Sequence, residues 1–187
     1  MNTLPCITIC QPYASLIVGW DGMVKEDLKR IENRTWPPDR NYRGPLLIHA
    51  GASRKWLKGY TGVLPPDDAM PFKAIVGRVD LVECLPIEEV RKLSAMYSPR
   101  FGWARHHVHA EGPMCWILER PRRFLTPIPY SGKQKIFRVP SEVVDGVEEV
   151  PALNHLCEHL DPNRFLRQGT KAVCPGCEKW LGNYQSN

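Results

Sequence analysis

The sequence lacks any apolar run close to the roughly 20 residues that a membrane-spanning helix needs. Its N-terminus also lacks a basic region followed by an apolar block, which a secretion signal would have. We therefore expect a cytoplasmic protein with no membrane partner. The apolar share of 43% and the charged share of 24% are those of an ordinary globular protein, and 187 residues allow one sizeable core and a small appendage.

The motifs of several common enzyme classes are also missing. The sequence holds no phosphate loop, no dinucleotide fingerprint, no nucleophile elbow and no internal repeat. These absences count against P-loop nucleotide hydrolases, dinucleotide-dependent oxidoreductases, α/β-hydrolases and solenoids. The seven cysteines are an odd number in a chain without an export signal, so we expect buried or metal-bound thiols in preference to disulfides.

Positive charge is concentrated in one part of the chain. The net charge is +5, and residues 100–138 hold eight Lys or Arg against two acids, together with His106, His107 and His109. Such a zone fits a nucleic-acid partner, although a solvated basic face needs none. The side chains that we expect along a nucleic-acid backbone are Arg105, Arg120, Arg122, Arg123 and Lys133.

Residues 29–36 combine cations, a carboxylate, an amide and an indole. If this stretch is a strand, alternate side chains share a face. One face then carries Lys29, Ile31, Asn33 and Thr35. The second face carries Arg30, Glu32, Arg34 and Trp36. The second face would place Glu32 between two arginines, which can read phosphate or carbonyl groups, and Trp36 could stack on a base. A solvated edge strand is the alternative interpretation.

Short strands outnumber helices in the pattern. Alternating apolar residues predict strands at 7–9, 46–50, 74–84, 114–119, 122–125 and 135–139. Helical spacing predicts a helix at 13–18 and another that begins at Pro86 and continues to Met96. No strand–helix rhythm repeats, so we expect an α+β fold, a small mixed or antiparallel β-barrel with flanking helices. His49, inside a strand, is either a hydrogen-bonded core residue or a catalyst.

The C-terminal part differs in composition from the first 140 residues. Residues 141–150 read as an acidic connector, and residues 151–187 contain Cys174-Pro-Gly-Cys177 with Cys157 and His159 upstream. These four residues predict a structural zinc site that stabilises a short module. A pair formed by His155 and His159 is the alternative to Cys157 and His159, and unliganded or redox-active thiols are a further one.

Five stretches of the first 140 residues carry a family resemblance. They are 9–17 (ICQPYASLI), 29–34 (KRIENR), 42–50 (YRGPLLIHA), 116–118 (WIL) and 127–134 (PIPYSGKQ). In this order they resemble the ASCH domain family, part of the PUA-like superfamily of small β-barrels. The family signature G-x-K-x-x-E-x-R matches at Lys29, Glu32 and Arg34, whereas Asp27 stands where its glycine is expected.

The resemblance implies a cleft lined by the signature residues and an association with nucleic acid, most often RNA. We therefore expect a binding module for RNA or for a single-stranded or modified nucleotide. The expected ligand contacts are Lys29, Glu32, Arg34, Trp36, Gln11, Ser15 and His49.

The resemblance also implies two enzymatic alternatives. Some relatives are amidohydrolases of acylated cytidines, for which Lys29 and Glu32 would be the catalytic candidates, and others are ribonucleases, for which the three histidines would be. The amidohydrolases carry a threonine at the position of Glu32. A carboxylate among cations is expected to stay ionised and paired, which makes it a weak base, so binding is the favoured hypothesis.

Overall fold

The computed structural model describes residues 2–94, 96 and 98–151, and three short strands of the C-terminal segment. The chain divides into two compact units, Met1–Ala152 and Leu153–Asn187. In the second unit the strands form an antiparallel sheet of order β10-β9-β8. They are β8 (Leu166–Gln168), β9 (Lys171–Val173) and β10 (Trp180–Asn183).

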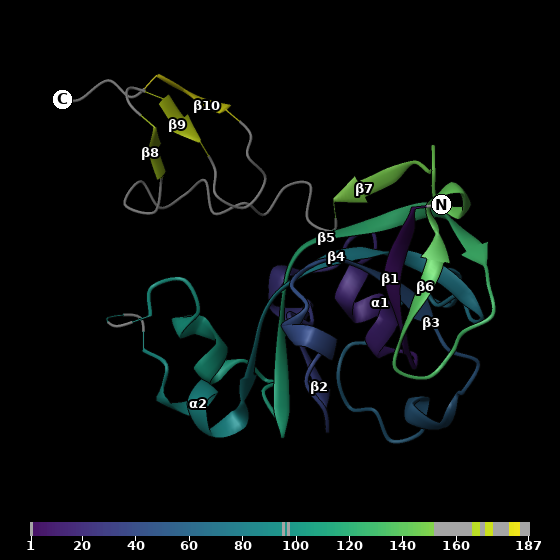
Figure 1. The fold of residues 1–187 in the computed structure, drawn as a ribbon, viewed down its shortest axis with the longest axis horizontal. Helices are drawn as coiled ribbons and strands as arrows, with labels where there is room; N and C mark the ends of the chain where they lie inside the picture. The colour runs from purple at the N-terminus through teal and green to yellow at the C-terminus, as the bar shows by residue number, and fades with distance from the viewer. Residues whose placement is uncertain are drawn as a thin grey trace. The chain divides into compact units, whose positions relative to one another are not determined.

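The first unit is built on one seven-stranded mixed sheet (Figure 1). The strands are β1 (Thr3–Ile9), β2 (Ile31–Arg34), β3 (Gly44–Ala50), β4 (Ala74–Pro86), β5 (Met114–Pro129), β6 (Ile136–Pro140) and β7 (Glu149–Pro151). Their order is β2-β5-β4-β3-β1-β6, with β7 added beside β5. Only β1 and β3 run parallel among the described pairs. Three register shifts between β4 and β5 bend these long strands, because bulges increase local twist.

Helices are few and short. The two α-helices are α1 (Tyr13–Val18) and α2 (Ile87–Lys92). Single 3₁₀ turns lie at Lys25–Asp27, Asp39–Asn41, Lys55–Leu57, Asp67–Ala69, Gly102–His106 and Ser141–Val143. α1 follows Pro12 and ends at Gly19, whose φ of 77° is one that glycine adopts without strain. None of the described helices is long and apolar enough to cross a membrane.

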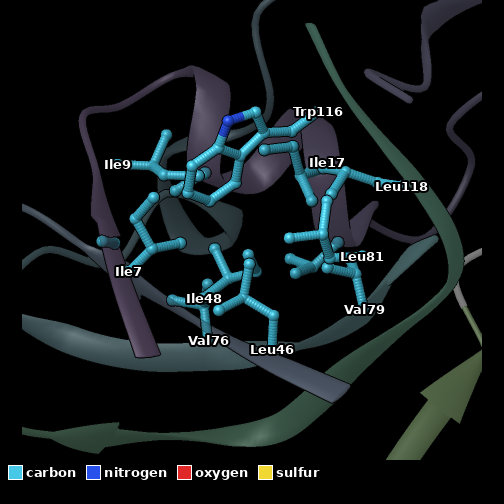
Figure 2. Close-up of a cluster of buried hydrophobic side chains, with 13 residues drawn as sticks. Ile7, Ile9, Ile17, Leu46, Ile48, Val76, Val79, Leu81, Trp116 and Leu118 are labelled. Atoms are coloured by element: carbon cyan, nitrogen blue, oxygen red, sulfur yellow. The ribbon is translucent and has the colours of Figure 1, made fainter. Parts of the chain in front are cut away.

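Alternation along the strands divides the apolar side chains between the two faces of the sheet. On one face, α1 packs with β1, β3, β4 and β5 around Trp116, which is fully buried (Figure 2). On the other face, Leu47 and Phe124 pack with Phe137 and Val139 of β6. A third cluster joins Ile31 and Ile117 to α2. These clusters supply most of the stabilisation, because burial of apolar area is the dominant favourable term.

Gly77 of β4 is required by a close approach of three elements. A Cβ placed there would lie 2.2 Å from the carbonyl oxygen of Arg122 and 3.0 Å from Val18 Cγ1. We expect Gly77→Ala to lower the free energy of unfolding by about 2–3 kcal/mol, because the backbone of β5 would have to move. Urea unfolding measures this loss. Gly51→Ala is the control, since the nearest atom to its methyl would be a side-chain methyl of Thr8 at 3.2 Å and the nearest backbone atom would be 3.6 Å away. An equal loss in both variants would contradict the account.

The mixed sheet with few short helices agrees with the expected combination of mixed sheet and flanking helices, and three details differ. Residues 114–129 form one bent strand, because the bulges let the chain turn without leaving the ladder. α2 ends at Lys92, since Leu93 has extended dihedral angles, and Met96 is 80% exposed. The acidic segment 141–150 is more than a connector, because β7 pairs with β5 and Glu149 binds Arg78 at 2.7 Å.

The two end strands of the sheet, β2 and β6, form no ladder with each other among the described residues. β6 covers β1 only as far as Ile7, which faces Ile136. Beyond that point the carbonyl of Thr8 accepts a hydrogen bond from Arg34 Nη2 of β2 at 3.0 Å. A closed barrel would need a strand pair between β2 and β6. Here the Arg34 side chain instead connects β2 to β1.

Candidate functional site

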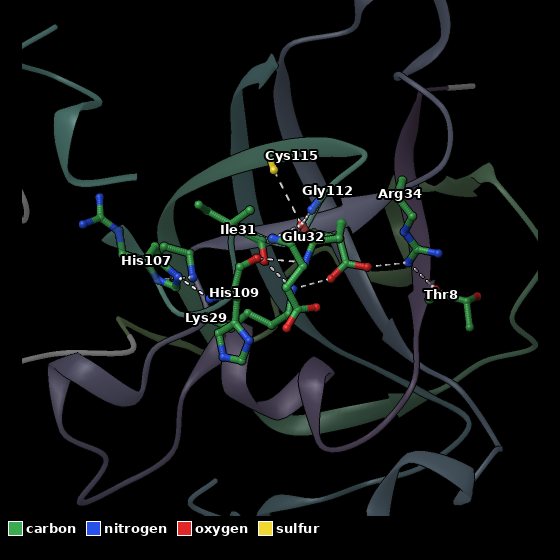
Figure 3. A network of polar contacts seen from close by, with 12 residues as sticks. Thr8, Lys29, Ile31, Glu32, Arg34, His107, His109, Gly112 and Cys115 are labelled. Carbon is green, nitrogen blue, oxygen red and sulfur yellow. Dashed lines mark hydrogen bonds and ion pairs between the residues drawn. The ribbon is translucent and has the colours of Figure 1, made fainter. Parts of the chain in front are cut away.

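Lys29, Glu32 and Arg34 form a compact charged group, here called the polar triad (Figure 3). Lys29 Nζ lies 2.6 Å from Glu32 Oε2, and Arg34 Nη2 lies 3.0 Å from Glu32 Oε1. Lys29 and Glu32 are buried, whereas the Arg34 side chain is 23% exposed. Both carboxylate oxygens are therefore engaged, and Arg34 is the member of the triad that is open to solvent.

The position of Lys29 differs from the alternation that the sequence predicted. β2 begins only at Ile31, and the backbone N–H of Lys29 donates to the carbonyl of Leu16 at 2.9 Å. From there its side chain reaches Glu32. Arg30 lies elsewhere, with its guanidinium 3.8 Å from the ring centroid of Trp103. The prediction of Glu32 between two arginines is wrong, and the pairing of Glu32 with Arg34 on one face is confirmed.

Arg34 keeps hydrogen-bonding capacity that the described residues leave unused. Its Nη2 binds Glu32 and the Thr8 carbonyl, but its Nε is buried without a partner. Buried donors are nearly always satisfied in folded proteins, so an unpaired one points to a missing acceptor, either a water or a ligand.

Trp36 follows Arg34 by two residues, just beyond the end of β2. Its ring meets Trp116 edge-on with centroids 4.9 Å apart, and Trp116 Nε1 donates to the Trp36 carbonyl at 3.2 Å. It packs against the buried cluster of Figure 2 and is only partly exposed. Part of its surface is therefore already used for the core.

Asn33 fixes the loop that carries His109. Its Nδ2 donates to the His109 carbonyl at 2.8 Å, and its Oδ1 accepts from the backbone N–H of Gly112 at 3.0 Å. His107 lies in the same loop, and its ring is 5.7 Å from that of His109. Residues some 75 positions apart in the chain are thereby held beside the triad (Figure 3).

Both of these histidines are held in the neutral form. Burial lowers the pKa of His107 to about 4, assisted by the nearby His109. Burial also lowers the pKa of His109 to about 4, and the charge of Lys29 acts in the same direction. Neither ring can act as an acid at neutral pH, since an effective general acid needs a pKa near the working pH.

Stability should consequently fall in mild acid. The unfolded chain takes up protons at the ordinary histidine pKa of about 6.5, whereas the folded state resists until about 4. The contribution of the two neutral histidines to the free energy of unfolding is complete above pH 7 and is lost as pH falls from about 6.5 to 4. After allowance for partial exposure, the free energy of unfolding should fall by roughly 2–3 kcal/mol in total.

Urea unfolding at pH 7.5, 6 and 5 measures this dependence. We expect His107→Asn with His109→Asn to flatten the profile, leaving a residual slope from His49, whose pKa burial also lowers. The exposed His106 provides the control, and His106→Asn should leave the profile unchanged. An unaltered slope in the double variant would contradict the assignment.

A cluster of aromatic side chains stands next to the triad and was not predicted from the sequence. Tyr13 contacts Trp56, Tyr60 and His109, with ring centroids 6.4, 5.8 and 6.1 Å away. Lys29 Nζ lies 5.7 Å from the Tyr13 centroid, and Trp56 is 51% exposed. Tyr13, Trp56 and Tyr60 are here called the aromatic cluster. Its members come from α1 and a loop without periodic pattern, so no sequence signal joined them.

Gln11 and Ser15 lie in the fold with their polar atoms occupied. Gln11 Nε2 donates to Ser15 Oγ at 2.9 Å and to the Pro71 carbonyl at 2.8 Å, and Ser15 Oγ donates to the Ala69 carbonyl at 2.6 Å. Both residues are almost fully buried. They attach α1 to the loop before β4, and their contact with a ligand stays a prediction.

His49 lies on the opposite face from the buried cluster of Trp116. It is 2% exposed, and its Nε2 is 2.9 Å from the Tyr130 carbonyl. Its place in the core agrees with the first of the two interpretations that the sequence left open.

Three of the five cations expected along a nucleic-acid backbone lie in β5, and the other two lie elsewhere in the first unit. Arg120 pairs with Asp80, and Arg123 pairs with Asp21 at 2.7 Å. Arg122 lies in β5 beside β7. Arg105 and Lys133 are exposed. Exposed ion pairs are weak, so the paired arginines remain able to exchange partners.

No metal-binding group of three or more His, Cys, Asp or Glu occurs within residues 2–94, 96 and 98–151 or the three C-terminal strands. The predicted zinc ligands Cys157, His159, Cys174 and Cys177, and the alternative His155, lie outside the described residues. The zinc site therefore stays a prediction from the sequence.

Comparisons with known proteins agree with the resemblance. Residues 7–128, more than half of the chain, match the ASCH domain family. A crystal structure of ASCH from Zymomonas mobilis shares 13% identity at a TM-score of 0.44, covering 77% of this chain and 95% of that one. A tyrosine-to-phenylalanine variant of that protein shares 13% identity at a TM-score of 0.44, and the match covers 79% of this chain and 100% of that one. No curated protein matches the sequence. The family match shows that the chain belongs to the ASCH domain family.

Proposed function

We propose that this protein binds single-stranded nucleic acid, with RNA as the preferred form, and holds an unstacked base against the aromatic cluster. The observation that carries the proposal is the half-exposed Trp56 beside Tyr13, which itself adjoins Lys29 of the triad. Stacking on aromatic rings contributes about 1–3 kcal/mol per base and tolerates any base, since every base has a π-face.

The polar triad supports recognition of the edge of that base or of its sugar–phosphate. Glu32 is buried and fully paired, so its role is to hold Lys29 and Arg34 in place. Arg34, with an unpaired Nε and partial exposure, supplies donors for a carbonyl or phosphate oxygen. With Glu32 as the positioning residue and Arg34 as the donor, the pocket would be organised before the ligand arrives. Such preorganisation lowers the entropic cost of binding.

The enzymatic alternatives have less support from the geometry. Lys29 Nζ donates to Glu32 and to the carbonyl of Ile31, so it is already engaged by two acceptors of its own chain. Glu32 has no free oxygen with which to activate water. His107 and His109, both neutral at pH 7, lack the acid that a histidine-based ribonuclease would need.

Fluorescence anisotropy with single-stranded and duplex RNA and DNA, over a series of salt concentrations, tests the proposal. We expect the tightest binding to single strands, with an affinity that falls as salt rises because counterions are released. Absence of salt-dependent binding to every nucleic acid would refute it. Incubation with acylated cytidines decides the hydrolase alternative, since release of cytidine that is lost in Lys29→Ala would establish that alternative.

A further inference from the structure

A hollow of about 600 Å³ lies on the connection between β5 and β6. Its lining consists of Lys73, Pro129, Tyr130, Ser131 and Lys133. The hollow is open to solvent, and two ammonium groups and a serine hydroxyl on its lining can donate to an anion. Nothing in the polar triad or the aromatic cluster accounts for this hollow.

The loop that forms the hollow is fixed on both sides by its backbone. The N–H of Tyr130 donates to the Lys73 carbonyl at 3.0 Å, and the carbonyl of Tyr130 lies 2.9 Å from His49 Nε2. Thr8 Oγ1 donates to the Lys133 carbonyl at 2.9 Å. Gly132 fits against the imidazole of His49, where a Cβ would lie 2.4 Å from Cε1. The backbone is thus anchored, and the side chains of Lys73, Ser131 and Lys133 are exposed and can meet a ligand.

The two lysines of the hollow differ from those arginines of this domain that form ion pairs. Lys73 and Lys133 are exposed and form no ion pair with any described residue, whereas Arg78, Arg100 and Arg123 all do. Lys73 also has a φ of 54°, in the left-handed region that side-chain-bearing residues seldom adopt. Strain of this kind is concentrated at functional sites.

Thr8 places the hollow next to the polar triad. Its carbonyl accepts from Arg34 Nη2 at 3.0 Å, and its hydroxyl donates to the carbonyl of Lys133. The triad and the hollow therefore lie on either side of a single residue. Arg34 and Lys133, far apart in the chain, can face neighbouring groups of one extended ligand.

We propose that this hollow binds a phosphate group of the bound nucleotide strand, with Lys73 and Lys133 as its cationic contacts and Ser131 as a hydroxyl donor. The inference rests on the proposed function and adds to it the path of the backbone, which runs from the triad past Thr8 to the β5–β6 connection. The phosphate is either an internal phosphodiester or a terminal phosphate.

Anisotropy with a labelled single-stranded oligoribonucleotide, with and without a 5′-phosphate, tests the inference. For Lys73→Gln with Lys133→Gln we expect 5- to 20-fold weaker binding in 100 mM salt. The salt slope should fall by about 0.7–1.4, the value for one or two released counterions on a single strand. Arg91→Gln with Lys92→Gln, which removes two exposed charges from α2, is the control and should bind within twofold of wild type.

The outcomes separate the hollow from the proposed function. Loss with both oligonucleotides assigns an internal phosphodiester, and loss only with the phosphorylated one assigns a terminal phosphate. Wild-type binding with an unchanged slope in the lysine variant overturns the hollow and leaves the proposed function standing. If wild type binds no oligonucleotide, titration with pyrophosphate tests the hollow independently of the proposed function. Amide NMR shifts at Ser131 and Lys133 would support phosphate binding there, and their absence would overturn it.

Discussion

Glu32→Gln should lower the free energy of unfolding by about 3–5 kcal/mol, the largest effect that we expect of any single substitution. The change removes the charge that both Lys29 and Arg34 face, and it leaves the buried ammonium of Lys29 uncompensated. For a chain of this length the midpoint of thermal unfolding should fall by on the order of 10 °C. Urea and thermal unfolding measure both quantities.

Two further variants show whether the loss comes from unpaired charge. Lys29→Met combined with Glu32→Leu removes both buried charges and should recover at least half of the stability, because Arg34 can turn to solvent. Glu83→Gln breaks a pair with Arg43 in which each side chain is about one-third exposed, and it should cost about 1 kcal/mol or less. A loss below about 1 kcal/mol in Glu32→Gln would contradict a structural role for the triad.

Trp56→Ala should weaken binding of single-stranded RNA by 10- to 100-fold, which corresponds to about 1–3 kcal/mol of lost stacking. Because Trp56 is half exposed, the fold should be unaffected. The slope of affinity against salt should not change, since stacking releases no counterion. Anisotropy titrations at three salt concentrations measure both quantities.

Trp56→Phe is the matched control for this prediction. It keeps a ring at the edge of Tyr13 and should retain most of the affinity. Equal binding by wild type and Trp56→Ala would show that the base lies elsewhere. A parallel loss in both Trp56→Ala and Trp56→Phe would indicate that the indole N–H is needed in addition to the ring.

The sequence was most informative where local periodicity decides the structure. Alternation placed Glu32 and Arg34 on one face of β2, and Tyr13 to Val18 formed the expected helix. The family signature pointed to the three residues that the fold brings together as the polar triad. In each of these cases the residues that form the pattern lie only a few positions apart in the sequence.

Other features of the site depend on contacts that no local pattern encodes. Lys29 lies outside β2 because its backbone N–H donates to the carbonyl of Leu16 in α1, and from there its side chain reaches Glu32. The guanidinium of Arg30 instead lies over the ring of Trp103, which is distant in the sequence. The aromatic cluster unites Tyr13 with a loop more than 40 residues away. The ends of β6 and β2 determine where Arg34 meets Thr8, and strand ends are a property of the whole sheet.

Photo-cross-linking of a 4-thiouridine oligoribonucleotide, followed by mass spectrometry of the linked peptides, is the most direct test of the central claim. The account predicts that cross-links concentrate on the peptides that carry Tyr13 and on those that carry Trp56 and Tyr60, and that Trp56→Ala reduces them. Cross-links confined to α2 or to the tail beyond Ala152, with none at the aromatic cluster, would contradict it.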